Sequence, residues 1–119
     1  MLKVVIVDDE KPALDVLSHL IRKHTDMQIV GSYTIPADAL AAMSMQMPDA
    51  VFLDIEMPGM NGLELSRLLA SLRPDLEIVF VTASSKYGQM AMAGLSIDCI
   101  YKPVKPQDLV RYAEKWKKA

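Results

Sequence analysis

The chain has 119 residues, which is enough for one domain with a core of its own. Its net charge of −2 excludes the basic surface by which a domain binds nucleic acid directly. One cysteine cannot form an internal disulfide or a cysteine-based metal site, and no apolar stretch is long enough to span a membrane, so we expect a cytoplasmic protein without membrane contact.

Short apolar runs alternate with stretches in which apolar residues recur at helical spacing. The runs predict buried strands, and the spacing predicts helices with one face packed on a sheet. In chain order, the pattern predicts a strand over 4–7, a helix from 12, a strand over 27–33, a helix from 34 to 45, a strand over 50–53, a helix after Gly62 that contains 65–72 and stops before Pro74, a strand over 76–81, a helix from 84 or 85 to 93, a strand over 97–101 and a helix from 106. We expect Thr34 to cap the second helix. The apolar face of the third helix is expected to consist of Leu65, Leu68, Leu69 and Leu72.

Five strands that alternate with five helices favour an α/β fold. Connections long enough to hold a helix force the strands to run parallel, with helices on both faces of the sheet. We therefore predict a doubly wound, five-stranded parallel sheet with five flanking helices, forming a single domain over residues 1–119. In such a sheet, ligands bind in the crevice beyond the carboxyl ends of the strands.

Polar residues follow four of the predicted strands at that carboxyl edge. Asp8 and Asp9 follow the first strand, and Asp54 follows the third strand. Thr82 ends the fourth strand, and Lys102 follows the fifth strand. Because neighbouring strands lie about 4.8 Å apart, these groups can converge on one site. Three carboxylates and an ammonium at the ends of apolar strands therefore predict a functional site rather than a set of turn residues.

The residue types at this edge suit phosphoryl transfer. Three neighbouring carboxylates resist ionisation unless a cation such as Mg²⁺ compensates their charge, and Mg²⁺ takes oxygen ligands. Asp54 can attack phosphorus to give an aspartyl phosphate, while Lys102 and Thr82 neutralise charge on the phosphoryl oxygens. The structural alternative is a buried ion pair between Asp54 and Lys102, and we expect that pair in the resting protein as well.

The chain resembles the response-regulator receiver domains of bacterial two-component signalling over essentially its whole length. The resemblance rests on four segments that stand in the family's order, namely Asp8-Asp9, residues 54–62 with the sequence DIEMPGMNG, Thr82-Ala83 and Lys102-Pro103. The resemblance implies a flavodoxin-like sheet with the strand order 2-1-3-4-5. It also implies a cis peptide bond between Lys102 and Pro103.

The resemblance implies roles for the acidic residues and for partners. Asp54 would be the phosphoacceptor, taking the phosphoryl group from a sensor histidine kinase or a phosphotransfer protein. Mg²⁺ would be held by Asp9, Asp54 and the backbone carbonyl of Glu56, with Asp8 acting mainly through metal-bound water. The switched domain would act on an effector domain or target that the sequence does not identify, with dimerisation on phosphorylation as one route. The position of Tyr87 and its spacing from residues 91 and 92 resemble the sequence pattern of receivers that precede LytTR-type DNA-binding domains.

The switch position departs from the family's usual pattern. The resemblance implies that Thr82 turns inward to the phosphoryl group, which Lys102 also contacts. Many members carry Tyr or Phe three residues before the lysine, but this chain has Cys99, whose thiol is too small to fill the same cavity. Tyr101 lies on the same face of the strand and is the alternative candidate for the switch.

Two alternatives belong to other functional classes. A haloacid-dehalogenase-like phosphatase also uses an aspartate nucleophile with Mg²⁺, and Glu56 stands where that family has its second acid, but the chain has no room for a cap domain. A flavodoxin-like FMN binder would need a phosphate-binding loop after the first strand, where the acids at 8–10 would repel phosphate. We therefore predict a receiver with self-directed phosphotransfer and autodephosphorylation, and not a multiple-turnover enzyme.

Overall fold

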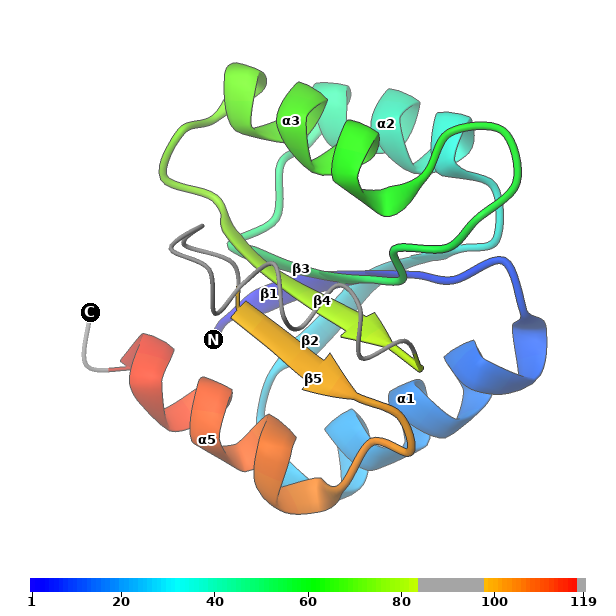
Figure 1. Cartoon of the computed structure of the whole chain (residues 1–119). Helices are drawn as coiled ribbons and strands as arrows, with labels where there is room; N and C mark the ends of the chain where they lie inside the picture. Colours follow the sequence, from blue (N-terminus) through cyan, green and yellow to red (C-terminus); the bar gives the residue numbers. More distant parts are fainter. Residues whose placement is uncertain (84–97, 118–119) are drawn as a thin grey trace.

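Parallel pairing of five strands gives one sheet in the order β2-β1-β3-β4-β5. Figure 1 shows this sheet between two layers of helices. The computed structural model describes residues 1–83 and 98–117. The strands are β1 (Lys3–Val7), β2 (Gln28–Tyr33), β3 (Ala50–Leu53), β4 (Glu77–Thr82) and β5 (Asp98–Tyr101). The predicted doubly wound, flavodoxin-like fold is confirmed, and the bounds of the first four strands agree with the prediction to within one residue.

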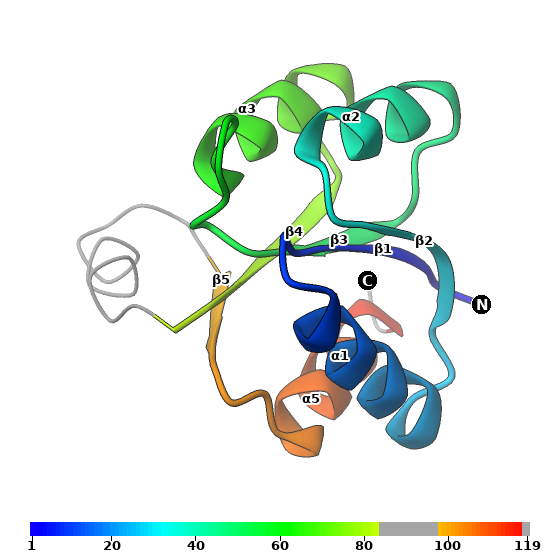
Figure 2. The same cartoon turned by 90° about the vertical axis from the view of Figure 1, so that its right-hand side faces the viewer.

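The helices lie in two layers, one on each face of the sheet (Figure 2). They are α1 (Lys11–His24), α2 (Pro36–Met45), α3 (Gly62–Leu72) and α5 (Pro106–Lys117). Helices α1 and α5 cover one face, and α2 and α3 cover the other. The helix predicted over 84–93 lies outside the described residues, as does Tyr87. Within the described ranges, no helix combines the length and the apolar character that crossing a bilayer requires.

The sheet divides the core into two parts because successive strand side chains point to opposite faces. On β3, Phe52 packs with the cluster under α1 and α5, while Leu53 packs with the cluster under α2 and α3. Both side chains are fully buried. Phe52 also contacts Trp116 of α5, with ring centroids 5.6 Å apart. The third strand is therefore held between the two helical layers, and this packing fixes the position of Asp54, the residue that follows the strand.

The residues at the N-termini of α3 and α2 explain where these helices begin, and one predicted cap was wrong. The Asn61 side chain caps α3 by accepting a hydrogen bond from the Glu64 backbone N–H at 2.9 Å. The prediction that Thr34 caps α2 was wrong, because Ile35 occupies the cap position and makes no side-chain cap. Pro36 opens that helix and disfavours helical geometry in the residue before it, so Ile35 is extended and the cap lies one residue beyond the predicted position.

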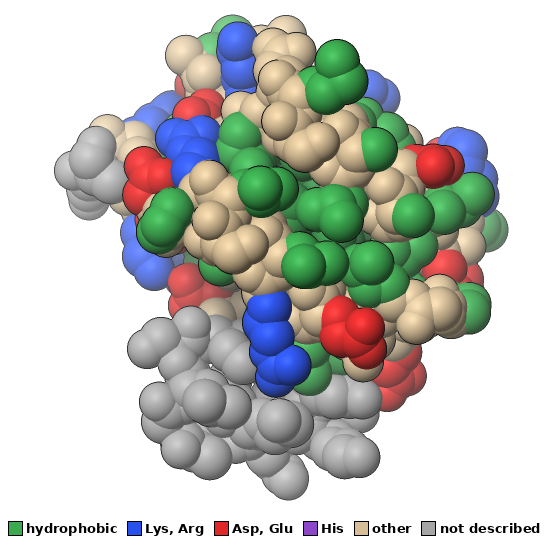
Figure 3. Space-filling view, turned by 90° about the horizontal axis from the view of Figure 1, so that it is seen from above, with side chains coloured by type: hydrophobic (Ala, Val, Ile, Leu, Met, Phe, Trp, Pro, Cys, Tyr) green, Lys and Arg blue, Asp and Glu red, His purple; other side chains and the backbone are tan. Residues whose placement is uncertain are grey.

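The outer surface of α2 and α3 is more apolar than the helical pattern predicted. Leu65 and Leu69 are fully buried, but Leu68 and Leu72 remain 43% and 53% exposed. These two leucines and Leu40 of α2 line a groove of about 410 Å³ between the helices. Figure 3 shows apolar side chains gathered over this face of the molecule. Only half of the predicted apolar face of α3 therefore packs into the core.

Candidate functional site

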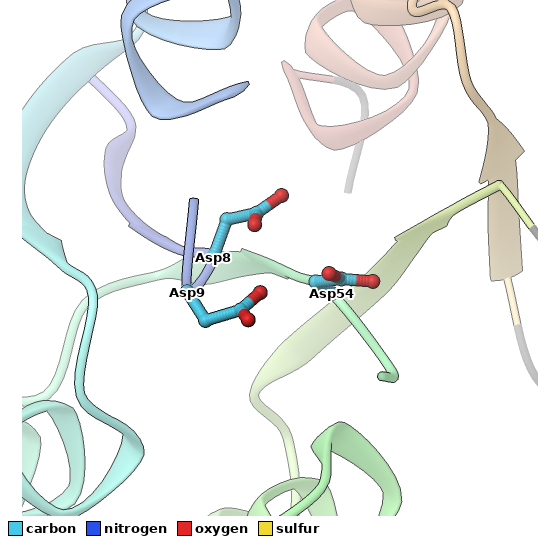
Figure 4. A group of neighbouring side chains, drawn as sticks. All are labelled: Asp8, Asp9 and Asp54. Atoms are coloured by element: carbon cyan, nitrogen blue, oxygen red, sulfur yellow. The ribbon is translucent and has the colours of Figure 1, made fainter. Parts of the chain in front are cut away.

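The register of the sheet brings the acids of β1 and β3 together at the carboxyl edge. Val7 lies beside Leu53 across the two strands, so Asp8 and Asp54 leave the sheet side by side. The Asp54 backbone N–H donates a hydrogen bond to the Val7 carbonyl at 3.0 Å, which extends the ladder by one residue. Figure 4 shows the side chains of Asp8, Asp9 and Asp54 directed into a common space. One carboxylate oxygen from each of the three lies within 4.8 Å of the others.

Backbone contacts and burial hold two of these carboxylates in place. Asp8 is 4% exposed and Asp54 is 7% exposed, while Thr82 at the end of β4 is 1% exposed. The Glu10 backbone N–H donates to Asp8 Oδ1 at 3.0 Å, and the Glu56 backbone N–H donates to Asp54 Oδ1 at 3.3 Å. Each carboxylate therefore uses one oxygen to order the loop that follows its own strand.

Lys102 closes the site from the fifth strand. Its backbone N–H donates to the Thr82 carbonyl at 2.9 Å, and its peptide bond to Pro103 is cis, as is typical of the family that the chain resembles. Its Nζ atom lies 2.7 Å from Asp8 Oδ2 and 3.7 Å from Asp54 Oδ2. The expected pair with Asp54 is present, but the closer partner is Asp8, which the sequence did not indicate.

The pKa values of Lys102 and Asp54 are both raised, for different reasons. Burial alone would lower the pKa of Lys102, but the hydrogen bond to Asp8 and the charges of Asp54 and Asp8 raise it above its usual value. Burial raises the pKa of Asp54 from 3.8 to about 6, and the charges of Asp8 and Asp9 add to that rise. The charge of Lys102 and the Glu56 N–H oppose it. Asp54 is therefore ionised at neutral pH, but the folded protein bears a free-energy cost for that charge.

The raised pKa of Asp54 predicts how stability depends on pH in the metal-free protein. Because the folded state holds this proton more tightly than the unfolded state, stability is lost as pH rises from about 4 to about 6 and stays lost above that range. We expect Asp54→Asn to raise the free energy of unfolding by about 1–2 kcal/mol at pH 7.5 in EDTA, and the gain to vanish near pH 4. Urea denaturation at both pH values measures this difference.

Asp8→Asn is the matched control for that measurement. Asp8 is the closest partner of Lys102, so removing its charge should destabilise the fold at pH 7.5 rather than stabilise it. A loss of stability in Asp54→Asn at pH 7.5 would contradict the raised pKa.

The three proposed switch residues lie on neighbouring strands. Thr82 pairs with Tyr101, and Phe80 pairs with Cys99, in the register of β4 and β5. Cys99 is half-buried against the cluster under α2 and α3, and burial raises the pKa of its thiol. Tyr101 is 46% exposed at its place beside Thr82. The roles of these residues in switching stay predictions.

The loop between Asp54 and α3 depends on a close backbone approach that sequence reasoning missed. The Gly62 N–H donates to the Ile55 carbonyl at 2.8 Å, which folds the loop back onto the end of β3. A Cβ atom at Gly62 would lie 2.2 Å from the Asp54 carbonyl oxygen. The only signal in the sequence is a glycine immediately after the Asn61 cap, which also fits an ordinary helix start.

Comparisons with known proteins agree with this arrangement. The family model described as "Response regulator receiver domain" matches residues 4–114. The sensory transduction protein LytT of Bacillus cereus is 36% identical over 118 residues, which are 99% of this chain and 48% of that protein. An uncharacterized response regulatory protein of Yersinia pestis is 39% identical over 113 residues, covering 93% of this chain and 46% of that protein. The chain thus spans about half the length of these curated relatives.

Solved structures of receiver domains have the same fold as this chain. The crystal structure of the response regulatory domain of MrkE from Klebsiella pneumoniae matches with a TM-score of 0.85 and 34% identity, covering 98% of this chain and 99% of that one. The isolated REC domain of RcsB from Salmonella enterica, at 20% identity and a TM-score of 0.85, shows the shared fold alone and covers 99% of this chain and 89% of that one. These likenesses give no support to the phosphatase alternative. The chain belongs to the response regulator receiver domain family of two-component systems.

Proposed function

We propose that Asp54 accepts a phosphoryl group in a Mg²⁺-dependent reaction and that the receiver domain spans residues 1–119. The observation that carries the proposal is the position of the Asp54 carboxylate. It lies beside two further carboxylates, and one of its oxygens is 3.7 Å from the Lys102 ammonium, at the open edge of the sheet. An ionised carboxylate in that position is a nucleophile with a cation beside it, which is the arrangement that phosphoryl transfer requires.

The donor atoms of the site fit a magnesium ion. Asp8, Asp9 and Asp54 offer only oxygen ligands, and one oxygen of each lies within 4.8 Å of the others. Asp9, Asp54 and the backbone carbonyl of Glu56 would hold the ion, and Asp8 would act through a bound water. The ion would supply positive charge that lowers the mutual repulsion of the carboxylates and of the incoming phosphate.

The side chains of the chain itself would carry the transfer. An oxygen of Asp54 attacks phosphorus, and the bond from phosphorus to the imidazole nitrogen of the donor phosphohistidine breaks, with the nitrogen keeping the electron pair. The Lys102 ammonium and the Thr82 hydroxyl would bind phosphoryl oxygens, because both stand at strand ends next to Asp54. Asp54 is consumed as the acceptor, so each chain takes one phosphoryl group.

The partner classes follow from the family. Receiver domains of response regulators work with histidine kinases and effector domains. We propose a phosphohistidine of a sensor kinase or a phosphotransfer protein as the physiological donor for this chain. We also propose that the phosphorylated domain acts on an effector domain or target protein.

The test is phosphoryl uptake from a small donor, followed by intact-protein mass spectrometry. With acetyl phosphate and Mg²⁺, the protein should gain one phosphoryl group that is labile in acid and in base, and it should gain none in EDTA. Continuous turnover of the donor, with many cycles for each protein molecule, would instead support the phosphatase alternative. Peptide mapping after borohydride reduction, which converts an aspartyl phosphate to homoserine, identifies the residue.

The same assay tests the metal ligands. Asp9→Ala should raise the Mg²⁺ concentration for half-maximal uptake by at least about tenfold, because it removes a charged ligand. Asp75→Ala changes the net charge equally, but Asp75 lies before the start of β4, at the opposite edge of the sheet, so the requirement should not change. An equal requirement for Mg²⁺ in Asp9→Ala and the wild type would refute the metal assignment.

A further inference from the structure

A mostly apolar cavity of about 170 Å³ opens directly beside the acidic cluster. It lies between α1 and the segment that joins β5 to α5. Its polar end is formed by Asp8 and Lys102, and its apolar walls include Ala13, Val16 and Val104. The cavity and the candidate phosphorylation site therefore adjoin each other through two shared charged residues, Asp8 and Lys102.

The apolar walls reach the surface of the molecule. Val16 is 56% exposed on α1, although it borders the cavity. Val104 packs against the buried cluster under α1 and α5. A single exposed aliphatic side chain needs no explanation. Val16 differs because it stands at the mouth of an apolar space that ends at a charged pair, so a ligand with one apolar end and one anionic end matches both parts.

We propose that this cavity binds the acyl chain of a small acyl phosphate while its phosphoryl group lies at Asp54. The inference rests on the proposed function and adds a binding site for the acyl chain of the small phosphodonor. The phosphate end is a dianion and meets the Lys102 ammonium, and the aliphatic end meets the walls formed by Ala13 and Val16. The domain should therefore discriminate among acyl phosphates by the length of the aliphatic chain.

The chemistry of the transfer fits an acyl phosphate. A bond forms between an Asp54 oxygen and phosphorus, and the bond between phosphorus and the acyl oxygen breaks. The electron pair of the broken bond stays on the departing carboxylate, so no proton has to be supplied. Because the product at Asp54 is itself an acyl phosphate, donor and product have similar phosphoryl-transfer potential, and the exchange needs no other energy source.

The test compares the second-order rate constants of uptake for acetyl, propionyl and butyryl phosphate with Mg²⁺ present. The three carboxylic acids differ little in acidity, so their intrinsic reactivity is similar and the ratio of rates reports contacts of the chain. We expect each added methylene to raise the rate constant by about two- to fourfold, the upper figure corresponding to complete burial of the methylene. Intact-protein mass spectrometry over time gives the rates.

Two substitutions in α1 test whether the preference for longer acyl chains arises in this cavity. Ala13→Leu fills the cavity, and Val16→Ser removes an apolar side chain from its exposed mouth. In both variants, the ratio of the butyryl to the acetyl rate constant should fall to about one, because the longer acyl chain loses its apolar contacts. Leu72→Ser, in the groove between α2 and α3, is the control and should keep the wild-type ratio.

The outcomes separate this inference from the proposed function. A wild-type rate that falls with chain length, or a preference that survives both α1 variants, would overturn the acyl-chain site. The exposed position of Val16 makes Val16→Ser decisive even if Ala13→Leu perturbs packing. Failure of every donor to modify the protein would overturn the proposed function itself.

Discussion

Replacing Asp54 with asparagine is expected to abolish phosphoryl uptake completely. The amide has nearly the shape of the carboxylate but is not a nucleophile, and it cannot form the acyl phosphate bond. The variant should remain folded, because it removes a charge that burial makes costly. Intact-protein mass spectrometry after incubation with acetyl phosphate and Mg²⁺ should therefore show only unmodified protein, at times when the wild type is fully modified.

Asp75→Asn is the matched control for this substitution. It makes the same chemical change at an exposed residue paired with Arg73, far from the carboxyl edge, and should leave uptake unchanged. Labelling that persists in Asp54→Asn and maps to Asp8 or Asp9 would show that the acceptor has been assigned to the wrong carboxylate.

Replacing Gly62, the first residue of α3, with alanine is expected to give a larger loss of stability than the same replacement of Gly59 in the β3–α3 loop. The added Cβ would lie 2.2 Å from the Asp54 carbonyl oxygen, 2.7 Å from a Leu53 side-chain atom and 2.8 Å from Ile55 Cα. Two of these are backbone atoms at the end of the central strand, so the clash cannot be relieved by a rotamer change. We expect the free energy of unfolding to fall by about 2–4 kcal/mol, despite the better helix propensity of alanine.

Gly59→Ala is the comparison for Gly62→Ala, because it introduces backbone strain without a steric clash. Gly59 has a φ of +83°, but nothing lies within 4 Å of its Cβ position. Alanine there should cost only about 1–2 kcal/mol, the penalty for a left-handed conformation. Urea denaturation of both variants measures the difference, and phosphoryl uptake should slow more in Gly62→Ala because the clash displaces the Asp54 backbone. Equal stability of the two variants would show that the close approach at Gly62 is not needed.

The gathering of the site residues was predictable because it depends on topology alone. The carboxyl ends of parallel strands lie at the same edge of a sheet, and four predicted strands were followed by or ended on Asp8, Asp54, Thr82 and Lys102. The register then places Asp8 beside Asp54 without any knowledge of side-chain packing. The roles of these residues in phosphoryl transfer stay predictions, since they depend on chemistry that a fold does not determine.

Contacts that depend on a rotamer or on one local dihedral angle were not predictable. A lysine side chain can reach either acid, and only the three-dimensional structure shows that Lys102 lies closer to Asp8 than to Asp54. The start of α2 was misplaced because the effect of Pro36 on Ile35 outweighed the capping preference of Thr34. Helical spacing likewise cannot distinguish the leucines of α3 that face the sheet from those that face the groove beside α2.

The ring contact between Phe52 and Trp116 gives the protein a built-in optical probe. Trp116 is the only tryptophan of the chain, and its indole packs on the residue two positions before Asp54. Its indole N–H has no hydrogen-bond partner within residues 1–83 and 98–117, so its fluorescence emission should lie toward the blue. Any shift of β3 that accompanies occupation of the carboxyl edge would reach this fluorophore through a single van der Waals contact. Ion binding and phosphorylation of Asp54 could then be followed in real time without an attached dye.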